Sequence, residues 1–185
     1  MSGASVFHIL FGSCIALLFV LNKPVSGDFK YERTIAFTVE RTADMSDSTT
    51  SRDIGAFNKN SQKIYLNIGE ALDVVTGRFK VPLEGVYYFY YSFSSETMDE
   101  ETRVELFKLE AGKDLKSATL QVFQSITPAL VSPLDSASAS VMVELKRDDE
   151  VFLRLAPGLL DADADRPLLF TGYLVYREGQ QALGY

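Results

Sequence analysis

Three aspartates near the C-terminal end of the chain have the residue type and spacing best suited to chemistry. Asp161, Asp163 and Asp165 alternate with alanines in the segment LDADADR. Carboxylates this close repel one another unless water or a cation separates them, and Ca²⁺ takes about six to eight oxygen ligands, often from Asp in loops. The spacing is not that of an EF-hand, which also needs a Gly and a Glu at set positions. The segment therefore predicts either a calcium site or a solvated acidic loop that aids solubility.

Histidine and cysteine, two residues that many hydrolases depend on, are scarce. The chain contains one His, His8, and one Cys, Cys14, and both lie near its N-terminus. If the segment that carries them is removed, Ser-His and Cys-His hydrolysis are excluded, as are zinc sites built from His or Cys. Two carboxylates could still catalyse glycoside hydrolysis, provided that they face each other across a substrate cleft. The scarcity of His and Cys favours a recognition function over catalysis, with a glycosidase as the alternative.

The N-terminus itself indicates export. Residues 6–21 carry no charged side chain. A secretory h-region needs about 7–15 apolar residues, whereas a membrane-spanning helix needs about 20. Pro24 follows the run, and Val25 and Gly27 provide the small residues of a cleavage site. We therefore expect residues 1–27 to be a signal peptide, cleaved from a secreted, extracellular protein that does not insert in a membrane. An uncleaved signal anchor is the competing interpretation, because no Lys or Arg precedes the run.

The net charge of the chain limits the classes of partner that it is expected to bind. The chain has 18 Lys and Arg against 25 Asp and Glu, a formal net charge of −7, and the basic residues form no run in the sequence. Nucleic acids and anionic membranes are bound through clustered cations. Neither is therefore expected as a partner.

The elements that must position these residues are strands. After a short segment at 28–33, period-2 alternation of apolar residues continues through one globular domain at 34–177, and a tail at 178–185 follows. Such spacing, with almost no helical period, predicts about eight to ten short strands in an antiparallel sandwich or barrel. We expect strands at 35–40, 63–68, 78–81, 86–93, 103–109, 118–123, 138–145, 150–155 and 168–176, and loops at 44–53, 71–75, 125–137 and 156–167.

The segment VYYFYYSF at 86–93 is apolar on both faces. Tyr87, Phe89, Tyr91 and Phe93 share one face and are expected in the core. Tyr88 and Tyr90 share the other face, which needs a second cover. Another subunit can supply that cover, so we predict that Tyr88 and Tyr90 lie in a homotrimer interface. A loop of the same subunit is the alternative cover.

The same region resembles a known family. The segment KIYLNIGEALDVVTGRFKVPLEGVYYFYYSF is similar to the globular head domain of complement component C1q and its relatives. The family has Phe where this chain has Ser61, and the other positions of its aromatic pattern match. The matching residues are Asn67, Leu72, Phe79, Gly85, Tyr87, Phe89 and Tyr91.

The resemblance implies a fold and a function. The fold would be an all-β, ten-stranded antiparallel jelly-roll sandwich, shared with tumour-necrosis-factor-type ligands, that assembles as a tight homotrimer. The function would be non-enzymatic, lectin-like recognition of extracellular ligands in innate immunity: microbial surface molecules, glycans or receptors. A receptor ligand or cell-surface organiser of the tumour-necrosis-factor or cerebellin kind is the alternative. Several relatives also carry an acidic loop before the last strand, and some bind calcium there. Asp163 and Asp165 match those positions, and Asp161 is an additional acid.

Overall fold

The computed structural model describes residues 34–57, 63–95, 101–127 and 135–177. The signal peptide expected at 1–27 and the tail at 178–185 lie outside these residues. Within the described ranges the chain forms strands and one short 3-10 helix, η1 (Leu115–Ser117). Antiparallel pairing joins every pair of neighbouring strands.

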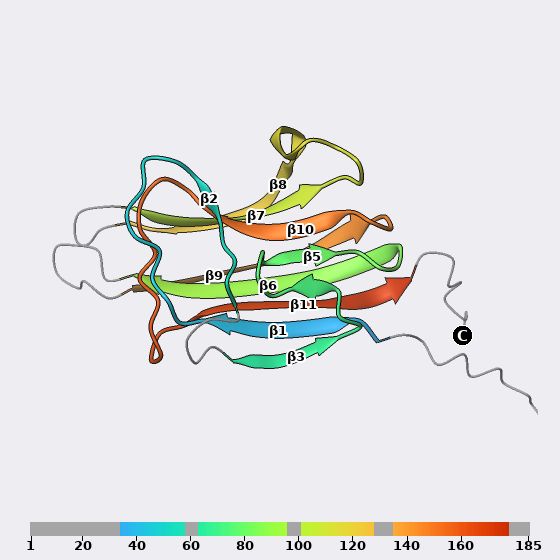
Figure 1. Ribbon diagram of the computed structural model, residues 1–185, viewed down its shortest axis with the longest axis horizontal. Coiled ribbons are helices and arrows are strands. Elements are labelled where there is room, and N and C mark those ends of the chain that lie inside the picture. The colour runs from blue at the N-terminus through green and yellow to red at the C-terminus, as the bar shows by residue number, and fades with distance from the viewer. Residues whose placement is uncertain (1–33, 58–62, 96–100, 128–134, 178–185) are drawn as a thin grey trace, which may run out of the picture. The chain divides into compact units, whose positions relative to one another are not determined.

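The strands make two sheets, stacked as two layers (Figure 1). The five-stranded sheet has the order β3-β1-β11-β6-β9, in which β1 and β11 are neighbours although they lie at opposite ends of the domain. Its members are β1 (Ala36–Arg41), β3 (Ile64–Ile68), β6 (Gly85–Ser95), β9 (Asp135–Leu145) and β11 (Leu168–Arg177).

The six-stranded sheet has the order β4-β5-β10-β7-β8, and β2 also pairs with β10. Its members are β2 (Arg52–Asp53), β4 (Leu72–Asp73), β5 (Arg78–Lys80), β7 (Thr102–Leu109), β8 (Thr119–Ile126) and β10 (Glu150–Leu155). The architecture is the jelly-roll sandwich that the alternating pattern and the family resemblance predicted. All nine expected strands are present, and the short strands β2 and β4 bring the number in the described residues to eleven, one more than the ten implied by the resemblance.

The core lies between the sheets and is dominated by aromatic rings. Alternation along β6 buries Tyr87, Phe89, Tyr91 and Phe93 almost completely, as predicted. Rings from both layers meet in its centre, where Phe37 on β1 packs against Phe79 on β5 with ring centroids 5.3 Å apart. The buried tyrosine hydroxyls need acceptors, because an unpaired polar group in the core is costly. The hydroxyl of Tyr87 donates to the carbonyl oxygen of Leu83 at 2.6 Å, and that of Tyr91 to Val104 at 2.7 Å.

Three expected loops are shorter than predicted. The loop at 44–53 contains β2, the turn region at 71–75 contains β4, and the loop at 125–137 loses residues to β8 and β9 at its two ends. Strands of two residues are too short to show a period in the sequence. β9 begins with the small polar residues DSAS, which show no apolar alternation. These residues are part of a strand because they pair with β6.

Candidate functional site

The outer face of the five-stranded sheet carries a continuous row of apolar residues. Because Phe37, Phe89 and Val143 point into the core, their neighbours along each strand point outward. The strand register then aligns one outward residue from each of the five strands. We call this set the apolar row: Ile68, Ala36, Tyr173, Tyr88 and Met142.

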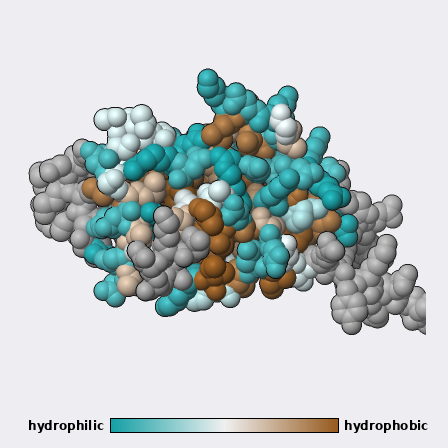
Figure 2. Space-filling model, viewed as in Figure 1, coloured by the Kyte–Doolittle hydropathy of each residue, from teal (hydrophilic) through white to brown (hydrophobic). Residues whose placement is uncertain are grey.

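Much of the apolar row is in contact with solvent. Ile68 is 47% exposed, Tyr173 42% and Met142 64%. The rings of Tyr88 and Tyr173 pack together with centroids 5.3 Å apart, which joins the two central strands of the face. Figure 2 shows one face of the molecule, where hydrophobic residues reach the surface among hydrophilic ones. A contiguous apolar surface of this kind is typical of an interaction site.

The next row along the same face is rich in hydroxyl groups. The register places Thr38, Thr171, Tyr90 and Ser140 side by side. The hydroxyl of Thr171 donates to that of Thr38 at 3.3 Å. The face therefore changes from apolar at one row to hydrogen-bonding at the next, which resembles the apolar centre and polar rim of a protein interface.

Tyr88 and Tyr90, the residues predicted for a trimer interface, lie on β6 within this face and are half-buried in the single chain. Sequence reasoning missed Ile68, Met142 and Tyr173, which extend the face across the sheet. Alternation in LLFTGYLVY marks Tyr173 as an outward residue, but the register that places it beside Tyr88 is a property of the folded sheet.

The acidic segment is folded tightly by its own contacts. Leu160 and Ala162 are buried in the core, and the backbone N–H of Ala162 donates to Asp44 at 2.9 Å. The alternation has a structural reason at Ala162, which faces inward while Asp161 and Asp163 remain half-exposed, whereas Ala164 is exposed.

Asp163 organises the turn that follows. One carboxylate oxygen accepts the backbone N–H groups of Asp165 and Arg166, each at 2.8 Å. The other oxygen accepts the guanidinium of Arg166 at 2.6 Å. The hydrogen bond from the Arg166 side chain, followed by that from the Asp165 backbone, lowers the pKa of Asp163 below its usual value.

The three aspartates are not gathered into one ligand set. Among the residues that the structure describes, no three Asp, Glu, His or Cys side chains are placed to hold a metal ion together. The carboxylate of Asp163 is engaged by Arg166, and Asp165 is exposed. Calcium binding by Asp161, Asp163 and Asp165 stays a prediction.

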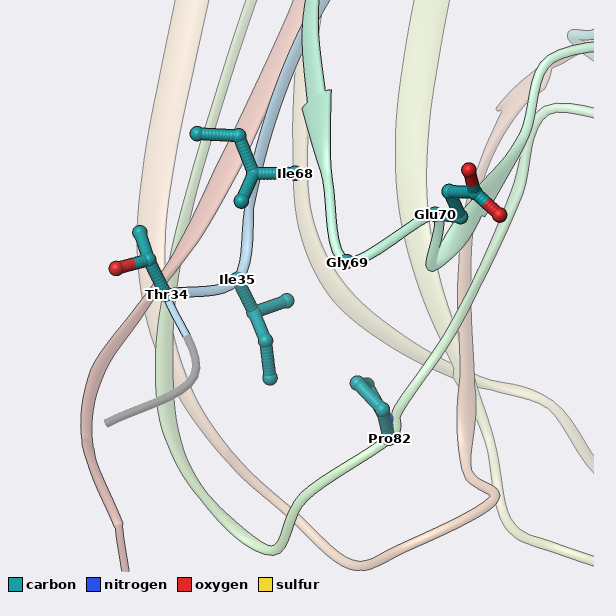
Figure 3. A pocket seen from close by; sticks show the side chains of 6 residues that line it. All are labelled: Thr34, Ile35, Ile68, Gly69, Glu70 and Pro82. Atoms are coloured by element: carbon teal, nitrogen blue, oxygen red, sulfur yellow. The ribbon is translucent and has the colours of Figure 1, made fainter. Parts of the chain in front are cut away.

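The described residues also line hollows at the border of the sandwich. A cavity of about 480 Å³ is lined by Thr34, Ile35, Ile68, Gly69, Glu70 and Pro82. Figure 3 shows Ile35 and Pro82 on either side of it. A hollow of about 370 Å³ has two carboxylate residues in its lining, Asp47 and Glu101.

In the described ranges, no helix has the length and apolar character required to span a membrane.

Comparison with known sequences gives a specific match. A family model described as the C1q domain matches residues 36–175. Human complement C1q tumor necrosis factor-related protein 3 is 33% identical over 123 residues, which are 64% of this chain and 46% of that protein. The chain therefore spans about half the length of this relative.

Solved structures agree on the fold. The globular domain of zebrafish complement 1qA protein superposes with a TM-score of 0.54 at 21% identity, covering 77% of this chain and 98% of that one. Murine APRIL superposes with a TM-score of 0.55 at 11% identity, covering 75% and 98%. At these identities the likeness concerns the fold alone. It shows that this chain has the jelly-roll fold that both structures share.

Proposed function

The chain belongs to the C1q-domain family, and on this premise we propose that it is a secreted recognition protein that works as a homotrimer. Its family and fold are those of non-enzymatic recognition domains. The ligands would be extracellular: microbial surface molecules, glycans or receptors, bound in the context of innate immunity. The observation that carries the proposal is the apolar row together with the family match over residues 36–175.

The homotrimer is supported by the energetics of the exposed face. Burying apolar surface contributes about 25 cal/mol per Å². Large side chains such as Tyr173 and Met142 gain this contribution only if a second surface covers them. A cyclic trimer covers the face of every subunit without leaving a free copy of it.

The first experiment measures the mass of the secreted protein by light scattering at micromolar concentration. We expect about three times the monomer mass. The variant Tyr88→Asp with Met142→Asp should be monomeric with an unchanged circular dichroism spectrum, because charges on the apolar row oppose its burial. Val75→Asp is the matched control, since Val75 is 57% exposed but lies in a turn outside this face. A monomeric wild type would contradict the trimer.

The second experiment identifies the ligand. Three subunits present three identical sites, so avidity should make the trimer bind arrayed glycans or microbial surfaces far more tightly than the monomeric variant does. Binding restricted to receptor-bearing cells would instead favour a receptor ligand or organiser of the tumour-necrosis-factor or cerebellin kind. The fold shared with murine APRIL supports keeping this second candidate.

A further inference from the structure

The turns at one end of the sandwich enclose a third hollow, of about 250 Å³. It lies between the β7–β8 turn and the β9–β10 turn, at the start of β10, whereas the acidic segment follows the end of β10. We call it the basic pocket, because three of its six lining residues are cationic. The lining residues are Lys108, Glu110, Ala111, Lys146, Arg147 and Asp149.

A buried aspartate fixes the shape of the basic pocket. Asp149 is 2% exposed. One of its oxygens accepts the backbone N–H of Ala111 at 3.0 Å, and the other accepts the backbone N–H of Lys146 at 3.0 Å. The ammonium of Lys108 lies 3.3 Å from the second oxygen and also donates to the carbonyl oxygen of Glu144 at 3.1 Å. Asp149 therefore ties the two turns together, and its charge is balanced by Lys108.

The two other cations are available to a ligand. The Lys146 side chain is exposed, and among the described residues its ammonium has no hydrogen-bond or ion-pair partner. The guanidinium of Arg147 is 4.0 Å from its nearest carboxylate, on Asp148, which is already paired with Lys80 at 3.2 Å. Glu110 is the one lining carboxylate that no cation of the described residues balances. A chain of net charge −7 thus keeps an excess of positive charge at this pocket.

We propose that the basic pocket binds an acidic group of a sugar chain, a sulfate or a carboxylate, with Arg147 and Lys146 as its cationic contacts. A planar guanidinium can hold such a group through two parallel hydrogen bonds, and a neighbouring ammonium adds a point charge. The pocket is formed by turns at the end of the sandwich, so an interface on the outer face of the five-stranded sheet does not require its residues. This proposal rests on the proposed recognition function, for which it names a ligand class.

The test uses the full secreted protein and three immobilised polysaccharides: heparin, which is sulfated, hyaluronan, which carries carboxylates alone, and neutral dextran. We expect binding to heparin, hyaluronan or both, and none to dextran. Lys146→Ala with Arg147→Ala should weaken binding about tenfold or more, since each lost charged contact removes a strong hydrogen bond. Both side chains are exposed, and Asp149 is held by the backbone of Lys146, so the fold should survive. Lys113→Ala with Lys116→Ala is the control, because these lysines are exposed on the same β7–β8 connection but outside the pocket lining.

The outcomes separate the sources of the acidic group. Binding to heparin alone identifies sulfate, and binding to hyaluronan identifies carboxylate. If the two double variants lost polysaccharide binding equally, the assignment of the ligand to the basic pocket would be wrong, because the attraction would then come from positive charge in general. Equal binding to dextran, or single-stranded DNA competing as well as heparin, would overturn the assignment to acidic sugars. If the trimer bound another extracellular ligand and both double variants retained that binding, the proposal for the basic pocket would be wrong, whereas the proposed recognition function would stand.

Discussion

Asp163 is a residue whose carboxylate is already engaged by the chain. Its two oxygens accept hydrogen bonds from the backbone of Asp165 and from Arg166. A calcium ion at this position would have to share these oxygens with Arg166 or displace its guanidinium. Calcium binding and the Arg166 ion pair are therefore expected to compete.

Calcium at millimolar concentration is predicted to raise the melting temperature, because a ligand that binds only the folded state stabilises it. Asp163→Ala with Asp165→Ala should abolish the shift, and Arg166→Gln should enlarge it by freeing Asp163. Scanning calorimetry with and without calcium measures both effects. The absence of a shift in the wild type, or an equal shift in the double variant, would exclude this loop as the site.

Two core tyrosines have perturbed ionisation. Burial raises the pKa of Tyr87 to about 12, because the phenolate is disfavoured away from water. Burial also raises the pKa of Tyr91. In the unfolded chain a tyrosine has a pKa of about 10. Between about pH 10 and 12 the unfolded chain has therefore lost protons that the folded chain retains.

Stability is predicted to fall with rising pH in that window. Each of these tyrosines should lower the free energy of unfolding by up to about 1.4 kcal/mol per pH unit, and neither contributes below about pH 9. Urea unfolding at a series of alkaline pH values measures the slope. Tyr87→Phe should reduce the slope, although it loses the hydrogen bond to Leu83 at every pH. An unchanged slope in this variant would contradict the prediction.

At the scale of elements, β11 depends on one glycine. Gly172 lies opposite Phe37 on β1 and Phe89 on β6. A Cβ added there would lie 2.6 Å from a ring carbon of Phe37 and 2.7 Å from one of Phe89. The absence of a side chain at this position lets the two rings approach the central strand from both sides.

Gly172→Ala is predicted to destabilise the domain by about 1–3 kcal/mol, because overpacking displaces core rings. The sign of the stability change is informative, because Gly→Ala at an unstrained position usually stabilises a protein by about 0.4–1 kcal/mol. Thr171→Ala on the outer face of the same strand is the control and should change stability little. Denaturant unfolding compares the two, and a stabilised Gly172→Ala would disprove the packing argument.

The strand β2 shows why some elements could not be predicted from the sequence. Its two residues pair with β10, and Asp53 forms ion pairs with Arg78 and Arg154. The guanidinium of Arg78 lies over the ring of Phe152 at 4.3 Å and helps to bury it. These contacts join residues far apart in the sequence, so a local pattern in the polar segment at 44–53 cannot reveal them. The longer strands were predictable because alternation is local.

At the scale of the whole molecule, the outer faces of the two sheets differ. On the six-stranded sheet, Arg78, Arg103 and Arg154 cover aromatic rings and pair with carboxylates. Much of the apolar surface of that face is therefore covered by side chains of the same chain. On the five-stranded sheet, no arginine of the described residues lies over the rings of the apolar row. The proposed trimer therefore uses the five-stranded sheet and leaves the turns at the end of the sandwich to ligands.

The sequence by itself determined the fold class, the core face of each long strand and the family, because alternation and motif spacing are local properties of the chain. It also identified Tyr88 and Tyr90 as outward-facing aromatics. Only the tertiary structure decided which residues join them, because cross-strand register sets those neighbours. It likewise tied Asp163 to Arg166 and brought Lys108, Lys146 and Arg147 to one pocket. The sequence contains no basic run, and a cluster built from two separate turns exists only once the sheets have paired.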